Sequence, residues 1–249
     1  MAMYSLIINK KCISLWPIMA NEYFKFKQFT IWQSDCAMKV GTDGTLLGAW
    51  AEGGQKILDI GTGTGLIALM MAQRFPESYI TGIDIDPAAV SQARINVAHS
   101  PFADHVEILE ADAHDFNGTF DAIVSNPPFF ADSLISPDSR RSIARHSLSL
   151  TYKALFETAR RLLTEQGIIS VVVPFDYVQK VKSEAALSGF FLHRDWAVKT
   201  TPHKNIRRFL LSFGLHSVRH IDAGVGVLEE SPGQRSDWYR QLTEAFYIK

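Results

Sequence analysis

The chain has 249 residues, of which 47% are hydrophobic and 20% are charged, and its formal net charge is −1. This is the composition of a folded globular protein, and it excludes a largely disordered, collagen-like or coiled-coil chain. The near-neutral charge excludes a protein that coats nucleic acid through bulk positive charge, but not one with a local basic patch.

The N-terminal segment has some features of a signal peptide. Lys10 and Lys11 precede a short apolar stretch, residues 12–20, which Pro17 interrupts. No clear cleavage pattern follows, and the stretch is far shorter than the roughly 18–20 apolar residues that a membrane span needs. We therefore expect residues 1–22 to be an extension outside the fold, residues 23–249 to form one domain, and no membrane association.

Strand and helix patterns alternate along most of the chain. Thr42 or Asp43 can cap a helix that ends at Trp50, and Asp86 precedes a later helix as its N-cap. Gly167 is placed to end another helix. The expected strands are residues 24–27, 57–60, 79–84, 106–109, 120–124, 168–173, 190–198 and 207–213, and the expected helices are residues 42–50, 66–75, 87–97, 151–163 and 178–187.

This alternation predicts the fold class. Strands that alternate with helices form a parallel sheet with helices on both faces, and right-handed crossovers give a doubly wound sandwich. We expect an α/β, Rossmann-like fold with a seven-stranded, mostly parallel sheet.

A glycine-rich loop, Asp59–Gly65 (DIGTGTG), lies at the first strand-to-helix turn. Glycines let a ligand approach the backbone closely, and the following helix offers free N–H groups. Asp84 ends the next strand, where a carboxylate can accept hydrogen bonds from ribose hydroxyls, and Asp112 follows the third strand, where it can reach an adenine amine. A tight turn alone can require glycine, but ligands bind at the carboxyl ends of such strands, so the three features together predict a cofactor site.

The loop resembles the S-adenosylmethionine site of class I methyltransferases. Its glycine spacing, at Gly61, Gly63 and Gly65, is GxGxG, whereas dinucleotide-binding folds use GxGxxG. The cationic sulfonium needs no phosphate cradle, which suits a loop flanked by the carboxylate of Asp59. The spacing therefore argues against an NAD-dependent oxidoreductase.

The segment Ser125–Phe129 (SNPPF) follows the fourth strand of this series. It resembles the Asn-Pro-Pro-aromatic motif of enzymes that methylate nitrogens conjugated to a π system. Such dipeptides also mark ordinary turns, but the position directly after a strand of a cofactor-binding sheet favours a catalytic role.

The chemistry of N-methylation explains these residue types. The lone pair of an exocyclic amine such as adenine N6 is delocalised into the ring, so the amine is a poor nucleophile. The Asn126 side-chain oxygen and the Pro127 carbonyl can each accept one N6–H, which frees the lone pair for attack. Pro127 and Pro128 fix the backbone, and Phe129 offers a face on which a flipped base can stack. Positioning and electrostatics then carry catalysis without a strong general base.

A longer stretch before the glycine loop narrows the substrate. Residues 26–29 (FKQF) and 36–50 (CAMKVGTDGTLLGAW) look like bacterial tRNA1(Val) (adenine-37-N6)-methyltransferases, although a capped helix packed on the sheet edge accounts for part of the second pattern. The resemblance continues through residues 58–61, 68–74, 125–128 and 242–247, and it covers roughly residues 23 to 249.

The family resemblance implies a monomeric class I fold, an S-adenosylmethionine donor and methyl transfer to N6 of A37 in valine tRNA. It implies a catalytic base pocket formed by Asn126, Pro127, Pro128 and Phe129. For the cofactor it implies contacts from Lys39, Thr42, Asp43, Asp59, Gly61 and Asp84, and the loop and strand-end positions add Gly63, Gly65, Asp112 and Asn126. Two departures are Phe129, where tyrosine is common, and residues 1–22, which match nothing in the family.

Basic residues gather at two places beyond the base pocket motif. Arg140, Arg141 and Arg145 lie on the segment that follows it, and a second cluster, which includes Lys204 and Arg207, precedes the last strand. Runs of charge are usually solvated surface, but these positions around the catalytic edge favour contacts with RNA phosphates. We expect a tRNA partner and no DNA partner.

No metal site is predicted. The two cysteines, Cys12 and Cys36, cannot build a disulfide framework, and the chain has no CxxC pair and no HExxH motif. Few cysteines fit a reducing, cytoplasmic compartment.

Two other functions remain open from the residues alone. Release-factor glutamine methyltransferases and rRNA guanine-N2 methyltransferases carry the same four-residue motif, because a side-chain amide and an exocyclic amine pose the same lone-pair problem. A non-enzymatic partner subunit of the same fold is disfavoured, since such subunits often lose the glycine loop or the motif.

Overall fold

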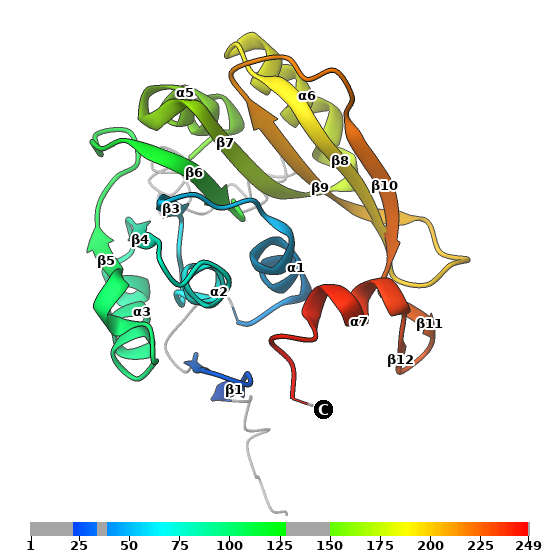
Figure 1. The fold of residues 1–249 in the computed structure, drawn as a ribbon, viewed down its shortest axis with the longest axis horizontal. Helices are drawn as coiled ribbons and strands as arrows, with labels where there is room; N and C mark the ends of the chain where they lie inside the picture. The colour runs from blue at the N-terminus through cyan, green and yellow to red at the C-terminus, as the bar shows by residue number, and fades with distance from the viewer. Residues whose placement is uncertain (1–21, 34–38, 128–149, 249) are drawn as a thin grey trace, which may run out of the picture.

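The computed structural model describes residues 22–33, 39–127 and 150–248. Its centre is a sheet of eight strands with helices on both sides (Figure 1). The strands are β3 (Lys56–Ile60), β4 (Tyr79–Asp84), β5 (Val106–Glu110), β6 (Phe120–Ser125), β7 (Leu163–Pro174), β8 (Phe191–Lys199), β9 (Ile206–Gly214) and β10 (Asp222–Val227).

The strand order positions the site. Across the sheet it is β10-β8-β9-β7-β6-β3-β4-β5, and β9 is antiparallel to both of its neighbours whereas the other neighbouring pairs are parallel. The chain leaves β3 for β4 on one side and later returns to β6 on the other. Connections that diverge in this way open a crevice at the carboxyl ends of β3 and β6, where ligands bind in open α/β sheets.

Helices cover both faces of the sheet, as the alternating pattern predicts. On one face lie α1 (Thr42–Trp50), α2 (Leu66–Arg74), α3 (Pro87–Ala98) and α7 (Asp237–Thr243), and on the other lie α5 (Tyr152–Leu162) and α6 (Val178–Leu187) (Figure 1). Each face has its own apolar core: Leu46, Leu69 and Val90 belong to the first, and Phe156 and Val181 to the second. The Rossmann-like α/β prediction is confirmed.

The sheet has eight strands rather than the seven expected, because β10 adds an edge strand parallel to β8. The sequence of β10, DAGVGV, contains two glycines, which are poor strand formers and which hid the strand. The structure shows why they are there. A Cβ at Gly224 would meet the Trp196 ring at 2.9 Å, and a Cβ at Gly226 would meet the Trp238 ring at 2.4 Å. The glycines make room for these two stacked indoles.

Two expected helix ends are also wrong. Gly41, not Thr42 or Asp43, occupies the N-cap of α1, and no side chain caps that helix. Gly167 does not end a helix: α5 ends at Leu162, β7 begins at once, and the β6–β7 register shifts between Phe120 and Ala122. Gly167 lies in that irregularity, where its Cβ would come within 2.8 Å of the Leu163 side chain. The expected Asp86 cap of α3 is confirmed, since Asp86 Oδ1 accepts from the Ala88 N–H at 3.0 Å.

The two ends of the described chain meet beside the first core. A hairpin of β1 (Tyr23–Lys25) and β2 (Thr30–Trp32) packs its inward rings against the C-terminal segment, and Lys27 N–H donates to the Phe246 carbonyl at 2.8 Å. Two short strands, β11 (Glu229–Ser231) and β12 (Gln234–Arg235), precede α7. Residues 1–21 lie outside the described residues, so the expected N-terminal extension stays a prediction. None of the described helices is long and apolar enough to cross a membrane.

Candidate active site

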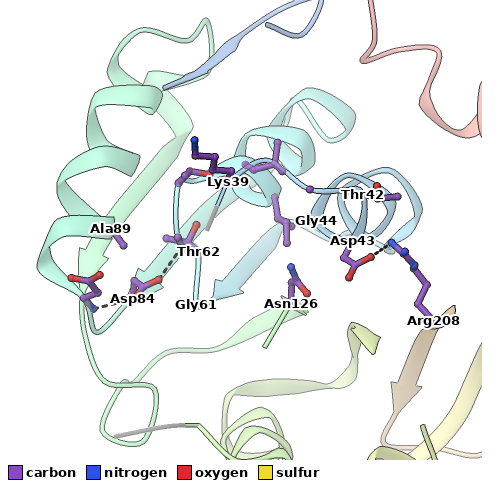
Figure 2. A pocket seen from close by; sticks show the side chains of 16 residues that line it. Lys39, Thr42, Asp43, Gly44, Gly61, Thr62, Asp84, Ala89, Asn126 and Arg208 are labelled. Carbon is purple, nitrogen blue, oxygen red and sulfur yellow. Dashed lines mark hydrogen bonds and ion pairs between the residues drawn. The ribbon is translucent and has the colours of Figure 1, made fainter. Parts of the chain in front are cut away.

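A pocket of about 400 Å³ opens at the carboxyl ends of β3, β4 and β6 (Figure 2). Its walls come from the glycine loop, the start of α1, the end of β4 and the segment after β6. The volume lies in the range of roughly 300–1,000 Å³ that is usual for small-molecule sites. Seven of the residues predicted to bind the cofactor line it: Lys39, Thr42, Asp43, Gly61, Gly63, Asp84 and Asn126.

The glycine loop presents bare backbone to this pocket. Gly61 and Gly63 have φ of 73° and 56°, and an added Cβ at either position would meet no atom within 4 Å. Because both residues line the pocket, that open space is pocket space. Gly65 differs: it is the N-cap of α2, and its Cβ would contact Ala93 of α3 at 3.4 Å. Gly65 therefore serves helix packing, while Gly61 and Gly63 leave room for a ligand.

Asp59 does not line the pocket, but its hydrogen bonds hold the glycine loop in place. It is fully buried, and its Oδ2 accepts from Thr62 Oγ1 at 2.7 Å and from the Ala68 N–H at 3.1 Å. Burial raises the pKa of Asp59 to about 7, although both hydrogen bonds act to lower it. The carboxyl group thus ties the loop to the first turn of α2.

Asp84 joins the loop to the end of β4. Its Oδ2 accepts from the Gly63 N–H at 2.9 Å, and its Oδ1 accepts from the Asp86 N–H at 3.0 Å. A carboxylate has about four acceptor positions, so both oxygens can accept further hydrogen bonds from the pocket. This is the arrangement that two vicinal hydroxyl groups need.

Asn126 stands between the glycine loop and the start of α1 (Figure 2). Ser125 holds the strand end, because its Oγ donates to the Ile60 carbonyl at 2.8 Å. The Oδ1 of Asn126 is buried and has no hydrogen-bond partner in the described part of the chain. A buried unpaired acceptor costs roughly 1–3 kcal/mol, so its presence at a pocket wall indicates a function. Pro127 is buried beside it, whereas Pro128 and Phe129 lie outside the described residues.

Arg208 is a pocket residue that the sequence did not assign to the cofactor site. It comes from β9 and forms an ion pair with Asp43 at the start of α1 (Figure 2). In the sequence, Arg208 directly follows Arg207 of the second basic cluster, and nothing nearby marks it as a pocket residue. The antiparallel direction of β9 brings the beginning of that strand to the edge where the parallel strands end. No local pattern distinguishes such a strand from a parallel one.

The other predicted site residues lie elsewhere. Asp112 follows β5 and accepts from the His114 N–H at 2.9 Å, which lowers its pKa, and it is not part of the pocket wall. Lys204 and Arg207 are exposed near the start of β9, while Arg140, Arg141 and Arg145 lie outside the described residues. No cluster of three or more His, Cys, Asp or Glu side chains that could hold a metal ion occurs among residues 22–33, 39–127 and 150–248.

Sequence comparison with known proteins shows the family to which the chain belongs. The chain is 45% identical over 235 residues to a tRNA1(Val) (adenine(37)-N6)-methyltransferase of Bacteroides thetaiotaomicron, covering 92% of this chain and 99% of the relative. A protein of the same name from Yersinia enterocolitica is 40% identical over 243 residues, covering 93% of this chain and 95% of the relative. The chain belongs to this methyltransferase family. The family identification made from residues 26–29 and 36–50 is thereby confirmed, and the protein is an enzyme.

Two coarser comparisons agree with that assignment. The family model described as a methyltransferase small domain matches residues 41–204, which contain all the residues that line the pocket except Lys39 and Arg208. The solved structure of a predicted O-methyltransferase from Agrobacterium tumefaciens superposes with a TM-score of 0.63, covering 82% of this chain and 96% of that one. At 16% identity this second likeness shows the fold alone.

Proposed function

We propose that this methyltransferase transfers the methyl group of S-adenosylmethionine to N6 of A37 in tRNA1(Val). The proposal depends chiefly on Oδ1 of Asn126, which is buried at the pocket wall and has no hydrogen-bond partner among residues 22–33, 39–127 and 150–248. A position that leaves a polar atom unsatisfied in the free protein gains most when a substrate N–H reaches it. Adenine N6 offers such an N–H.

The pocket suits the cofactor. The carboxylate of Asp84 faces it with acceptor positions for the ribose hydroxyls, and the open space at Gly61 and Gly63 lets the rest of the molecule lie against the loop. Lys39 and Thr42 also line the pocket, and we propose that they contact the methionine end of the cofactor. The bound cofactor supplies a methyl group on a sulfonium. Asp112 and Gly65, which do not line the pocket, are weaker candidates for direct contact.

The protein's part in the reaction is to prepare the amine. Asn126 Oδ1 and the Pro127 carbonyl each accept one N6–H, so the nitrogen lone pair turns from the ring towards the methyl group. Burial of the Asn126 oxygen strengthens this contact, because no water competes for it. Phe129 would stack on the flipped base. After the attack, the methylated N6 carries a positive charge and is acidic. It can therefore lose a proton to solvent without a strong base.

The names of the relatives favour tRNA over the alternatives. The Asn-Pro-Pro-aromatic motif fits guanine N2 of rRNA and a release-factor glutamine equally well, but the relatives that cover almost all of the chain are named for adenine 37 of tRNA1(Val). We further propose that the protein acts as a monomer in the cytoplasm and that Lys204, Arg207, Arg140, Arg141 and Arg145 contact tRNA phosphates.

Nucleoside mass spectrometry tests the proposal. A tRNA1(Val) transcript is incubated with the protein and isotope-labelled S-adenosylmethionine, and an A37-to-G transcript serves as the control. We expect labelled N6-methyladenosine in the first transcript and no label in the second. Label in both transcripts, or label only when rRNA or a release factor is supplied, would overturn the assignment.

A further inference from the structure

Strands β7 and β9 extend beyond the end of β6, which Asn126 follows, and they form a wall beside the pocket. Ser125 of β6 pairs with Val171 of β7, and β7 continues for three more residues to Pro174. At about 3.3 Å per residue, this carries β7 roughly 10 Å past the level of Ser125. Pro174 pairs with Arg208 of β9, which lines the pocket. A polynucleotide that leaves the pocket on this side must pass over the end of the wall.

Phe175 stands at the end of this wall. Its side chain is 50% exposed, and its ring centroid lies 6.3 Å from that of Phe209 at an interplanar angle of 32°. Phe209 is itself partly buried against the core below α6 and has the Lys182 ammonium 5.6 Å from its ring. Within the described part of the chain, Phe209 is the aromatic neighbour of Phe175, and about half of the Phe175 surface is exposed. Water-exposed aromatic surface of this size has an unfavourable solvation free energy that a stacking partner would remove.

Positive charge lies next to this ring. The β7–β9 register pairs Val173 with Phe209 and ends with Pro174 opposite Arg208. Phe175 follows Pro174 directly and begins a short 3-10 turn, Phe175–Tyr177. Arg207 precedes Arg208 in β9 and lies at an irregularity of the β8–β9 pairing, where Val198 pairs with Arg208 and Lys199 with Ile206. Arg207 is exposed, as is Lys204 before it, whereas Asp176 offsets one of these charges. The end of the wall therefore carries an exposed aromatic ring, and the start of the neighbouring strand β9 carries exposed cations.

We propose that Phe175 stacks on an unpaired anticodon-loop base next to the target adenine, while Arg207 and Lys204 contact the adjoining phosphates. The proposal rests on the proposed function, because it needs an RNA substrate. Proteins read single-stranded RNA by stacking splayed bases on aromatic rings and by cations along the backbone. Flipping A37 into the pocket would leave its neighbours without a stacking partner, and Phe175 offers one at the end of the strand that pairs with the pocket residue Arg208.

Substitutions of Phe175 test whether its aromatic face stacks on a base or whether the side chain only covers apolar surface. Phe175→Leu keeps apolar contact with Phe209 but removes the stacking face, and Phe175→Trp keeps both. The matched control is Phe191→Leu: Phe191 is 48% exposed but pairs with Gly214 at the opposite end of β9. Binding of a fluorescent tRNA1(Val) transcript is measured by anisotropy, alongside the KM for S-adenosylmethionine and the melting temperature.

We expect Phe175→Leu to weaken transcript binding about tenfold, within the range for loss of one base–aromatic stack. Phe175→Trp and Phe191→Leu should bind like the wild type, and no variant should change the KM for S-adenosylmethionine. Wild-type affinity for Phe175→Leu would mean that the ring is only apolar cover, and equal losses for Phe175→Leu and Phe191→Leu would mean a general effect. Either result overturns the proposal.

An abasic substrate locates the base. Transcripts that lack the base 5′ or 3′ of A37 are bound to the wild type and to Phe175→Leu. At one of the two positions the base removal and the substitution should not add, because each removes the same stack. Full additivity at both positions contradicts the proposal. Transcript binding and methylation of A37 are separate measurements, so a wild type that binds the transcript without methylating it would overturn the proposed function alone.

Discussion

The two walls of the pocket are held by contacts of very different range along the chain. In the wall formed by the glycine loop, Asp59 bonds residues three and nine positions away, and Asp84 bonds Gly63 at a separation of 21. In the opposite wall, Asp43 of α1 is paired with Arg208 of β9 across 165 residues. The first wall is thus built by one βαβ unit, whereas the second depends on how the whole sheet is wound.

This difference in the sequence range of their contacts suits the two walls to different tasks. The loop wall needs an exact backbone path if, as we propose, the cofactor lies against the main chain at Gly61 and Gly63. The α1–β9 wall is held by a contact between two side chains, the ion pair of Asp43 and Arg208, and lies next to the surface that we propose for RNA. We therefore expect substitutions in the loop wall to change cofactor affinity sharply, and substitutions in the α1–β9 wall to have smaller effects.

The largest effect should come from Asn126, which stands between the walls. Asn126→Ala removes the acceptor for N6–H but no contact with the sulfonium. We expect kcat to fall by about 10²–10³, the usual loss for one preorganised polar contact. Affinity for S-adenosylmethionine, measured by calorimetry, should fall far less than kcat, because Asn126 is only one of several residues that line the cofactor pocket. The control is Asn117→Ala, an exposed asparagine before the amino end of β6. Near-native turnover for Asn126→Ala would remove this residue from the mechanism.

Next in size is Asp84 of the loop wall. Asp84→Asn keeps an acceptor for the Gly63 N–H but loses the charge that strengthens hydrogen bonds to ribose hydroxyls. We expect cofactor affinity to fall by about 1.5–3 kcal/mol, with kcat at saturating cofactor nearly unchanged. Asp104→Asn, at an exposed position in the short turn before β5, should bind like the wild type. Equal affinities for both variants in calorimetry would show that Asp84 only holds the loop.

Asp59 gives the loop wall a pH dependence. Burial raises its pKa from 3.8 to about 7, so the folded protein binds a proton that the unfolded chain has lost between these values. Stability from this group is therefore full below about pH 4, and it declines as the pH rises towards 7. In the isosteric Asp59→Asn variant, that decline should be absent. The free energy of unfolding of this variant should exceed that of the wild type by at least about 1 kcal/mol at pH 8.

Denaturant melts of both proteins from pH 5 to pH 8 measure this difference. The Asn126→Ala variant serves as a control, since it leaves Asp59 unchanged and should keep the wild-type slope. Parallel stability curves for the wild type and Asp59→Asn would mean that the buried carboxyl group stays ionised. Its bonds to Thr62 and Ala68 would then outweigh the desolvation that raises its pKa.

The separation along the chain of the residues that form each feature also explains which features the sequence could predict. The glycine loop, the acid that ends β4 and the motif at Asn126 are each contained in a few consecutive residues, so the pattern alone identified them. Arg208 could not be recognised in this way, because its role depends on the antiparallel direction of β9 and on a partner at the other end of the domain. Strand β10 was missed because Gly224 and Gly226 match the shapes of Trp196 and Trp238, which only the folded chain brings together.

The smallest expected effect comes from breaking the ion pair between Asp43 and Arg208 that holds the α1–β9 wall. The carboxylate of Asp43 and the guanidinium of Arg208 retain 29% and 21% side-chain exposure, so water screens the pair only in part. Arg208→Ala should cost about 0.5–1 kcal/mol of stability and raise the KM for S-adenosylmethionine about two- to fivefold, because the start of α1 loses its tether. Arg208→Lys should recover part of this loss, since an ammonium restores the charge without the fork of donors.

A double-mutant cycle with Asp43→Asn isolates the pair from each residue's own contact with the pocket. If the ion pair is what holds the wall, the two substitutions together should cost less than the sum of the single ones by about 0.5 kcal/mol or more. Strict additivity would mean that Arg208 and Asp43 act separately on the ligand. The wall would then resemble the loop wall, where each residue meets the cofactor by itself, and the division of tasks between the two walls would be lost.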